Sequence, residues 1–262
     1  MTATTYFVIP IYNEAGNIGR VVSDIATRFP AGDWRVVVVD DGSQDESAAI
    51  LAGLSTRFGD QVVVVTHEIN RGVPAALSSG FGRAAQMAGD GDYLLCIEGD
   101  GTSNPALYEP IRAGLAAGNE IVIASRYIPG GGWVGFPWHR RLISRVGNWG
   151  LHRLFPYPHV TDFSIFYRGY RMSLVNKVLA RWGARAFSGR FFSANTGFLF
   201  CCLFERPPVA EVAHFYVYNL KRSMTKFRLR QALYGYLPLI ARISPWRLRQ
   251  ICLAERAVKF KN

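Results

Sequence analysis

Short apolar runs alternate with segments of helical spacing over the first 125 residues, and this alternation constrains the fold more than any other feature of the chain. The apolar runs are Tyr6–Pro10, Trp34–Val39, Val62–Thr66, Tyr93–Ile97 and Ile121–Ser125. Segments with helical spacing separate them, at residues 18–29, 45–54, 73–88 and 105–117. Because the runs are continuous, as in parallel strands covered on both faces, we predict a doubly wound, mostly parallel α/β sheet.

Beyond Arg126 the alternation stops and the predicted elements become irregular. A glycine-rich loop at residues 129–135 precedes a predicted helix at 139–154. The pattern then predicts a strand at 163–167, a helix at 171–181, an apolar segment at 198–204, a strand at 211–218 and a basic amphipathic helix at 226–243. Because no linker or low-complexity block divides the chain, we predict one domain at 1–218, with halves at 1–125 and 126–218, and a basic amphipathic extension at 219–262.

Charge is distributed very unevenly along the 262 residues, of which 49% are hydrophobic, enough apolar mass to exclude disorder as the main state. Residues 1–125 carry a net charge of −8, residues 126–205 carry +9 and residues 206–262 carry +10. This swing indicates a site for anions, either phosphorylated substrates, an anionic membrane surface or nucleic acid, or else a basic surface that serves solubility. We consider nucleic acid an unlikely partner, because no recognised nucleic-acid motif is visible.

The expected location is the cytoplasm. The longest apolar stretch near the end, Ala232–Ala241, is broken by Pro238 and is too short to span a bilayer, and the first twenty residues do not resemble a secretory signal. The cysteines lie in apolar segments without the spacing of a zinc site or a disulfide framework. The histidines also lack metal-site spacing and are expected to be structural.

Acidic residues follow three of the predicted strands. The strand ends read Tyr12-Asn13-Glu14, Asp40-Asp41-Gly42-Ser43 and Glu98-Gly99-Asp100, while the fifth strand ends in Ser125-Arg126. In an open parallel sheet ligands bind beyond the carboxyl ends of the strands, and clustered carboxylates repel one another unless a cation or donor groups compensate them. Hard oxygen ligands with room for phosphates suit Mg²⁺ or Mn²⁺, so a nucleoside diphosphate linked to a sugar would fit.

These strand ends resemble those of glycosyltransferase family 2, inverting and metal-dependent enzymes with the GT-A nucleotide-sugar fold. The runs Val8–Glu14 and Val39–Ser43 are similar to that family's two N-terminal signatures, and Glu98-x-Asp100 stands where the family carries its Asp-x-Asp metal motif. The resemblance implies that residues 1–125 are the nucleotide-binding half and 126–218 the acceptor half. It implies Asp100 as the main metal ligand, with Glu98 able to reach metal or ribose. Base and ribose would be held by Pro10, Tyr12, Glu14, Asp40 and Asp41.

The second half is similar to the polyprenol-phosphate sugar transferases within that family. The similarity lies in the runs at 125–131 and 138–144, with Asn148 and Asp162 following. It implies that Arg126, Arg140 and Ser144 face the acceptor phosphate and that Lys226 lies near the donor diphosphate. Interleaved tryptophans at 133, 138 and 149 suit a membrane interface, so we expect a peripheral protein at the inner face of the membrane. A solvated helix face is the other interpretation of the arginines at 140, 141 and 145.

Two mechanisms follow from the two kinds of acceptor. An ionised lipid phosphate can attack the anomeric carbon without a protein base, so that arginines suffice to position it. A hydroxyl acceptor needs a carboxylate to take its proton, and Asp162 is the acidic residue available between Arg126 and Phe204. In both cases we expect one displacement with inversion and a cation on the leaving diphosphate. A nucleic-acid-binding module and an inactive nucleotide-binding relative are the remaining alternatives.

Overall fold

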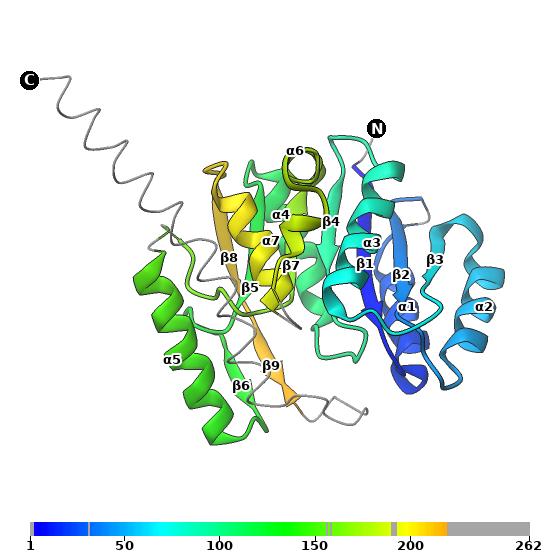
Figure 1. Cartoon of the computed structure of the whole chain (residues 1–262), viewed down its shortest axis with the longest axis horizontal. Helices are drawn as coiled ribbons and strands as arrows, with labels where there is room; N and C mark the ends of the chain where they lie inside the picture. Colours follow the sequence, from blue (N-terminus) through cyan, green and yellow to red (C-terminus); the bar gives the residue numbers. More distant parts are fainter. Residues whose placement is uncertain (1–2, 31, 156, 158, 190–192, 219–262) are drawn as a thin grey trace, which may run out of the picture.

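A seven-stranded sheet organises the protein (Figure 1). The structure, a computed structural model, describes residues 3–30, 32–155, 157, 159–189 and 193–218. The strand order is β3-β2-β1-β4-β7-β5-β8. The strands are β1 (Thr5–Ile11), β2 (Trp34–Asp40), β3 (Val62–Thr66), β4 (Tyr93–Cys96), β5 (Ile121–Ser125), β7 (Arg168–Arg171) and β8 (Val209–Ala213). The predicted mostly parallel α/β sheet is therefore confirmed, with all five predicted N-terminal strands in place.

One strand of this sheet runs against the others. β7 lies between β4 and β5 and is antiparallel to both, with Tyr93 opposite Arg171 and Ile121 opposite Tyr170. β8 then pairs in parallel with the outer side of β5. The C-terminal half thus contributes two strands to the sheet begun by the N-terminal half.

Helices cover both faces of the sheet because the strands are apolar on both sides. On one face Phe7 of β1 packs edge-on against Tyr108 of α4 (Tyr108–Ala116), and Phe29 at the end of α1 (Ala15–Arg28) joins them. On the other face Phe81 of α3 (Val73–Met87) contacts Tyr170 of β7 and Phe198 of α7 (Ser193–Leu203). The described residues share one buried core.

The remaining helices complete the two layers and the edges. α2 (Ser47–Phe58) packs beside α1, α6 (Met172–Trp182) lies beside α3 and α7, and short 3-10 turns occur at Gly59–Gln61, Pro105–Leu107 and Gly183–Phe187. Asn104 caps the 3-10 turn Pro105–Leu107 that precedes α4, and its side chain accepts a hydrogen bond from the amide of Ala106 at 3.0 Å. α5 (Trp138–Leu154) lies at the end of the molecule opposite α2 (Figure 1).

Two expectations for the C-terminal half were wrong in detail. Residues 163–167 do not form a strand, because the Asp162 side chain accepts hydrogen bonds from the amides of Ser164 and Ile165 and turns the backbone there. The apolar segment predicted at 198–204, to which the sequence analysis assigned no secondary structure, forms the C-terminal half of α7, which lacks periodicity because it is buried on all sides. The single strand expected at 211–218 is two strands, β8 and β9 (Phe215–Val217), and β9 pairs with β6 (Gly132–Val134) in a second small sheet.

No helix in the described part of the chain combines the length and the apolar character needed to cross a membrane. The predicted extension at 219–262, including the helix at 226–243, lies outside the described residues. The cysteines at 96, 201 and 202 are buried and form no disulfide with one another.

Candidate active site

β1 and β4 are neighbours in the sheet. From β1 the following strands, β2 and β3, lie toward one edge, whereas from β4 the following strands lie toward the other edge, so the strand order reverses between β1 and β4. Such a switch point leaves a crevice beyond the carboxyl ends of the two strands, and it is the usual ligand site of an open α/β sheet. Tyr12 and Glu14 follow β1, and Glu98 and Asp100 follow β4. The sheet therefore brings the predicted nucleoside-binding and metal-binding residues to one edge.

Side chains join the loops after β1 and β2 into one unit. The amide of Asn13 donates to the Ser43 hydroxyl at 2.9 Å, and the Asn13 side-chain oxygen accepts from the amide of Gln44 at 2.7 Å. The amide of Glu14 donates to the Ser47 hydroxyl at 3.1 Å. Asn13 has a φ of +54°, a left-handed conformation that asparagine tolerates better than most residues. These contacts hold together the loops after β1 and β2, which carry most of the residues that the sequence analysis assigned to base and ribose.

Asp41 points into the protein and fastens the turn before α3. Its carboxylate accepts hydrogen bonds from the amides of Arg71 at 2.9 Å and Gly72 at 2.7 Å, and it lies 2.7 Å from Nδ1 of His67. The other ring nitrogen of His67 lies 3.0 Å from the Ser79 hydroxyl. Asp41 therefore holds the turn at Arg71 and Gly72 in position.

The other predicted nucleoside-binding residues lie along the same edge. Asp40 ends β2, is buried, and accepts a hydrogen bond from the amide of Ser43 at 3.0 Å. Pro10 lies on β1 opposite Val39, and Tyr12 follows that strand half-buried. Lys226, predicted to lie near the diphosphate, is outside the described residues.

Glu98 and Asp100 converge on the hydroxyl of Thr102. Its oxygen lies 2.6 Å from Oδ1 of Asp100 and 3.0 Å from Oε2 of Glu98, and the Thr102 amide also donates to Asp100 at 3.1 Å. Tyr216 of β9 hydrogen-bonds to Thr102, and burial together with the charges of Glu98 and Asp100 raises the pKa of its hydroxyl. Two carboxylates held together at the ligand edge fit Mg²⁺ or Mn²⁺, which take one or two carboxylates along with substrate phosphates.

The acidic strand ends are compensated in different ways. Among the described residues, no group of three or more histidine, cysteine or acidic side chains is arranged to hold a metal ion. Backbone amides compensate Asp40 and Asp41, so that these carboxylates are stabilised by donor groups, the second of the two compensations that the sequence analysis considered.

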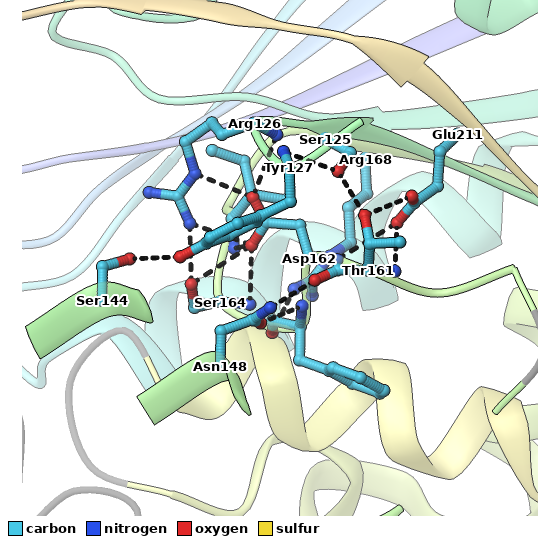
Figure 2. A network of polar contacts seen from close by, with 12 residues as sticks. Ser125, Arg126, Tyr127, Ser144, Asn148, Thr161, Asp162, Ser164, Arg168 and Glu211 are labelled. Atoms are coloured by element: carbon cyan, nitrogen blue, oxygen red, sulfur yellow. Dashed lines mark hydrogen bonds and ion pairs between the residues drawn. The ribbon is translucent and has the colours of Figure 1, made fainter. Parts of the chain in front are cut away.

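Arg126 and Asp162 form a buried ion pair beyond the end of β5 (Figure 2). Nε of Arg126 lies 2.7 Å from Oδ2 of Asp162, and Nη2 lies 2.9 Å from Oδ1. Burial alone would raise the pKa of Asp162, but the adjacent guanidinium and its hydrogen bonds outweigh burial and hold that pKa below its usual value. Conversely, burial would lower the pKa of Arg126, and the Asp162 charge raises it.

Elements from both ends of the segment 126–218 hold this pair in place (Figure 2). Glu211 of β8 accepts hydrogen bonds from the amides of Thr161 at 2.7 Å and Asp162 at 3.1 Å. Asn148 of α5 donates to the carbonyl of Thr161 and accepts from the amide of Phe163. The turn that carries Asp162 is thus pinned on two sides.

The same region brings Ser144 close to Arg126. The Ser144 hydroxyl lies 3.0 Å from the hydroxyl of Tyr127, and the Arg126 guanidinium lies over the Tyr127 ring, 5.6 Å from its centroid. Trp133 of β6 packs against Tyr127 and lies 5.7 Å from the same guanidinium. The backbone of Arg140 is in α5, one turn before Ser144, and its side chain is outside the described part of the structure.

The sequence analysis assigned no role to several residues of this site. Glu211 interrupts an otherwise apolar strand, a pattern that could have marked it as a buried partner. His214 follows β8 and is 1% exposed, its ring lies beside those of Tyr167 and Tyr216, and burial lowers its pKa to about 4, with the Arg126 charge adding to the effect. Neither ring nitrogen has a hydrogen-bond partner among the described residues.

Comparison with known proteins shows what the chain is similar to. The family model described as "Glycosyl transferase family 2" matches residues 6–179. The polyprenol monophosphomannose synthase of Mycolicibacterium smegmatis is 29% identical over 177 residues, which cover 68% of this chain and 65% of that protein. The dolichol-phosphate mannosyltransferase of Pyrococcus furiosus is 30% identical over 138 residues, which cover 53% of this chain and 37% of that protein. The matched stretches span less than two thirds of either relative.

Solved structures show the same fold at lower sequence identity. The glucosyl-3-phosphoglycerate synthase from Mycobacterium tuberculosis, solved with Mn²⁺, UDP and glucosyl-3-phosphoglycerate, has a TM-score of 0.61 and 18% identity, covering 92% of this chain and 79% of that one. Residues 1–349 of TarS from S. aureus with UDP give a TM-score of 0.57 and 16% identity, covering 82% and 60%. These likenesses confirm the predicted GT-A type of sheet.

Proposed function

Because this chain belongs to glycosyl transferase family 2 and is a glycosyltransferase, we propose that it moves a sugar from a nucleotide diphosphate sugar to a polyprenyl phosphate, with inversion at the anomeric carbon. The relatives named above support this acceptor class through their names. Such an acceptor places the reaction at a membrane surface, in keeping with the predicted peripheral location at the inner face.

The donor would lie at the switch point between β1 and β4. We assign base and ribose to Pro10, Tyr12, Glu14, Asp40 and Asp41, of which Asp41 acts by holding the turn at Arg71 and Gly72. Glu98 and Asp100 would hold Mg²⁺ or Mn²⁺, and Lys226 would lie near the diphosphate. When bound, the cation neutralises charge that grows on the leaving diphosphate.

The Arg126–Asp162 pair is the observation that carries the choice of acceptor. Asp162 is fully buried and accepts hydrogen bonds from the Arg126 guanidinium and from the amides of Ser164 and Ile165. A carboxylate with these donors and a lowered pKa is a weak base, so it is poorly suited to deprotonate a hydroxyl acceptor. It is well suited to orient Arg126 toward an acceptor that arrives already ionised.

In this scheme Arg126, Arg140 and Ser144 bind the acceptor phosphate and Asp162 is a positioning residue. Tyr127 links Ser144 to Arg126, because its hydroxyl meets the serine and its ring lies beneath the guanidinium. An oriented phosphate oxygen can attack the sugar directly, since a phosphate monoester is mostly ionised at neutral pH. No protein base is required in this mechanism.

The test is to incubate the purified full chain with a panel of nucleotide sugars, Mn²⁺ and a bacterial lipid extract, and to identify glycosylated lipids by mass spectrometry. We expect a product whose mass equals that of polyprenyl phosphate plus one glycosyl residue, that is, the sugar less one water, and no product with the Arg126→Met variant. Transfer to free saccharides without any lipid product would overturn the proposal in favour of a hydroxyl acceptor. In that case Asp162→Asn should abolish transfer outright.

A further inference from the structure

We propose that the outer face of α5 docks on an anionic lipid bilayer, with the helix axis lying along the membrane surface. This face, called here the α5 outer face, consists of four large apolar side chains that are exposed despite their size. Trp138 is 70% exposed, Leu142 54%, Val146 58% and Trp149 66%. In the described part of the chain, the other exposed large hydrophobic residues are Ile69, Val134 and Phe215.

The positions of these four residues along the helix show that the α5 outer face, a single stripe of side chains, points away from the protein. With 3.6 residues per turn, the four side chains fall within an arc of about 80° on the helix. Asn148 and Leu151, which are 6% and 5% exposed, lie on the opposite side. The helix therefore buries one face in the protein and presents a second apolar face outward, where an ordinary surface helix is polar.

The charge around the stripe favours an anionic surface over an apolar protein groove. Arg141, Arg145 and Arg153 are exposed on the same helix, and the Arg145 guanidinium lies 5.5 Å from the centroid of the Trp133 ring. The sequence from Ile121 to Thr161 contains no aspartate or glutamate. A helix with arginines beside a stripe of tryptophan and aliphatic side chains is typical of binding at the headgroup level of a bilayer.

The inner face of the same helix leads to the acceptor site. Ser144 meets Tyr127 beside Arg126, and Asn148 holds the turn that carries Asp162. One helix diameter, about 10 Å, therefore separates the α5 outer face from these residues. A membrane-anchored phosphate could reach Arg126 without its lipid tail leaving the bilayer. This last step rests on the proposed function, whereas the docking itself does not.

Docking is tested by sedimenting the full chain with phosphatidylcholine vesicles that contain phosphatidylglycerol, without donor or polyprenyl phosphate. We expect the double variant Leu142→Glu/Val146→Glu to partition into vesicles about tenfold less than the parent, because it removes apolar burial and adds repelling charge. Ile69→Glu is the matched control, since Ile69 is 72% exposed and lies in the other half of the chain. It should bind as the parent does, and circular dichroism should show all three proteins folded.

A second measurement locates the bound face directly. Brominated lipids should quench the tryptophan fluorescence of the parent, and Trp149→Phe should lose a measurable part of that quenching. Equal quenching in both proteins, or equal vesicle binding by the double variant and the control, would overturn the docking proposal. A dimer that dissociates in the double variant would also overturn it, because a second copy would then cover the face.

The two proposals can fail separately. Transfer to a short-chain polyprenyl phosphate in detergent tests the proposed function without any bilayer. We expect the double variant to retain that activity and to lose transfer to acceptor embedded in vesicles. Loss of both activities to the same extent would argue against a docking role for the α5 outer face.

Discussion

Arg126 and Asp162 face each other through two hydrogen bonds of 2.7 and 2.9 Å, although 36 positions separate them in the chain. The carboxylate is fully buried and the arginine is 9% exposed. A pair of this kind orients the guanidinium more firmly than a surface ion pair does, because both partners lack alternative positions. The link between β5 and the turn at residues 161–165 is therefore central to the proposed acceptor site.

Removing the charge of Asp162 should destabilise the protein strongly. Asp162→Asn leaves the Arg126 charge buried without its counter-ion, and we expect the free energy of unfolding to fall by about 3 kcal/mol. Glu109→Gln is the control, since the Arg112–Glu109 pair is 3.3 Å long and its glutamate is exposed. Glu109→Gln should lower the free energy of unfolding, measured by urea denaturation, by less than about 1 kcal/mol. Similar losses for the two variants would contradict the structural role of the buried pair.

Activity should depend on a divalent cation through Asp100. We expect EDTA to abolish sugar transfer, Mn²⁺ or Mg²⁺ to restore it, and Asp100→Asn to lower kcat by about a hundredfold or more at saturating metal. Glu109→Gln again serves as the control for loss of an acidic residue away from the site. Full turnover by metal-free protein would refute the assignment of Glu98 and Asp100.

Asp41 should act on the donor site through the backbone of the following turn. Asp41→Asn replaces an acceptor oxygen with an amide donor near the amides of Arg71 and Gly72, so we expect about 2 kcal/mol of lost stability. Hydrogen exchange at these two amides should accelerate, and the KM for the nucleotide sugar should rise more than kcat falls. Unchanged exchange at Arg71 and Gly72 would show that Asp41 does not hold the turn.

His214 should make stability depend on pH in a defined window. Burial lowers the pKa of His214 from 6.5 to about 4, so the unfolded chain binds its proton more readily. The free energy of unfolding should therefore rise with pH from about 4 to about 6.5, and be lost as the pH falls through that window. His214→Gln should flatten this slope when urea midpoints are measured across the window.

Asp162 does not obscure this measurement. Its folded pKa lies below the ordinary 3.8, so its contribution is present above that pH and is lost at lower pH. A variant curve parallel to that of the parent between pH 4 and 6.5 would exclude His214 as the source of the slope.

Most of the N-terminal half could be predicted from the sequence, because its parallel strands are continuous apolar runs with helices between them. The strand ends then fixed which residues share an edge, as with Glu98 and Asp100 around Thr102. The sequence shows how many acidic residues follow each strand and of which type, but it does not show in which direction their side chains point. Asp41 turns inward because the amides of Arg71 and Gly72 are available, which depends on the path of a later loop.

The C-terminal half was less predictable because its contacts are long-range. The Asp162 turn replaces the strand expected at 163–167, and its partners come from β5, α5 and β8. The change of sheet at His214 follows from its amide binding the carbonyl of Ser125, and from its carbonyl accepting from Gly132. No local sequence pattern predicts hydrogen bonds between residues so far apart in the chain. The roles of Arg140, Ser144 and Lys226, and the domain boundary at residue 218, stay predictions.

The insertion of β7 between β4 and β5 has a consequence for how the molecule is made. β5 pairs with β7 and β8, both of which follow it in the chain. During synthesis it must wait, without a neighbour on either side, until residues past Arg171 have left the ribosome. A fragment that stops at Ser125 would leave this strand without a partner at either edge, so we expect the first 125 residues not to fold as a separate domain.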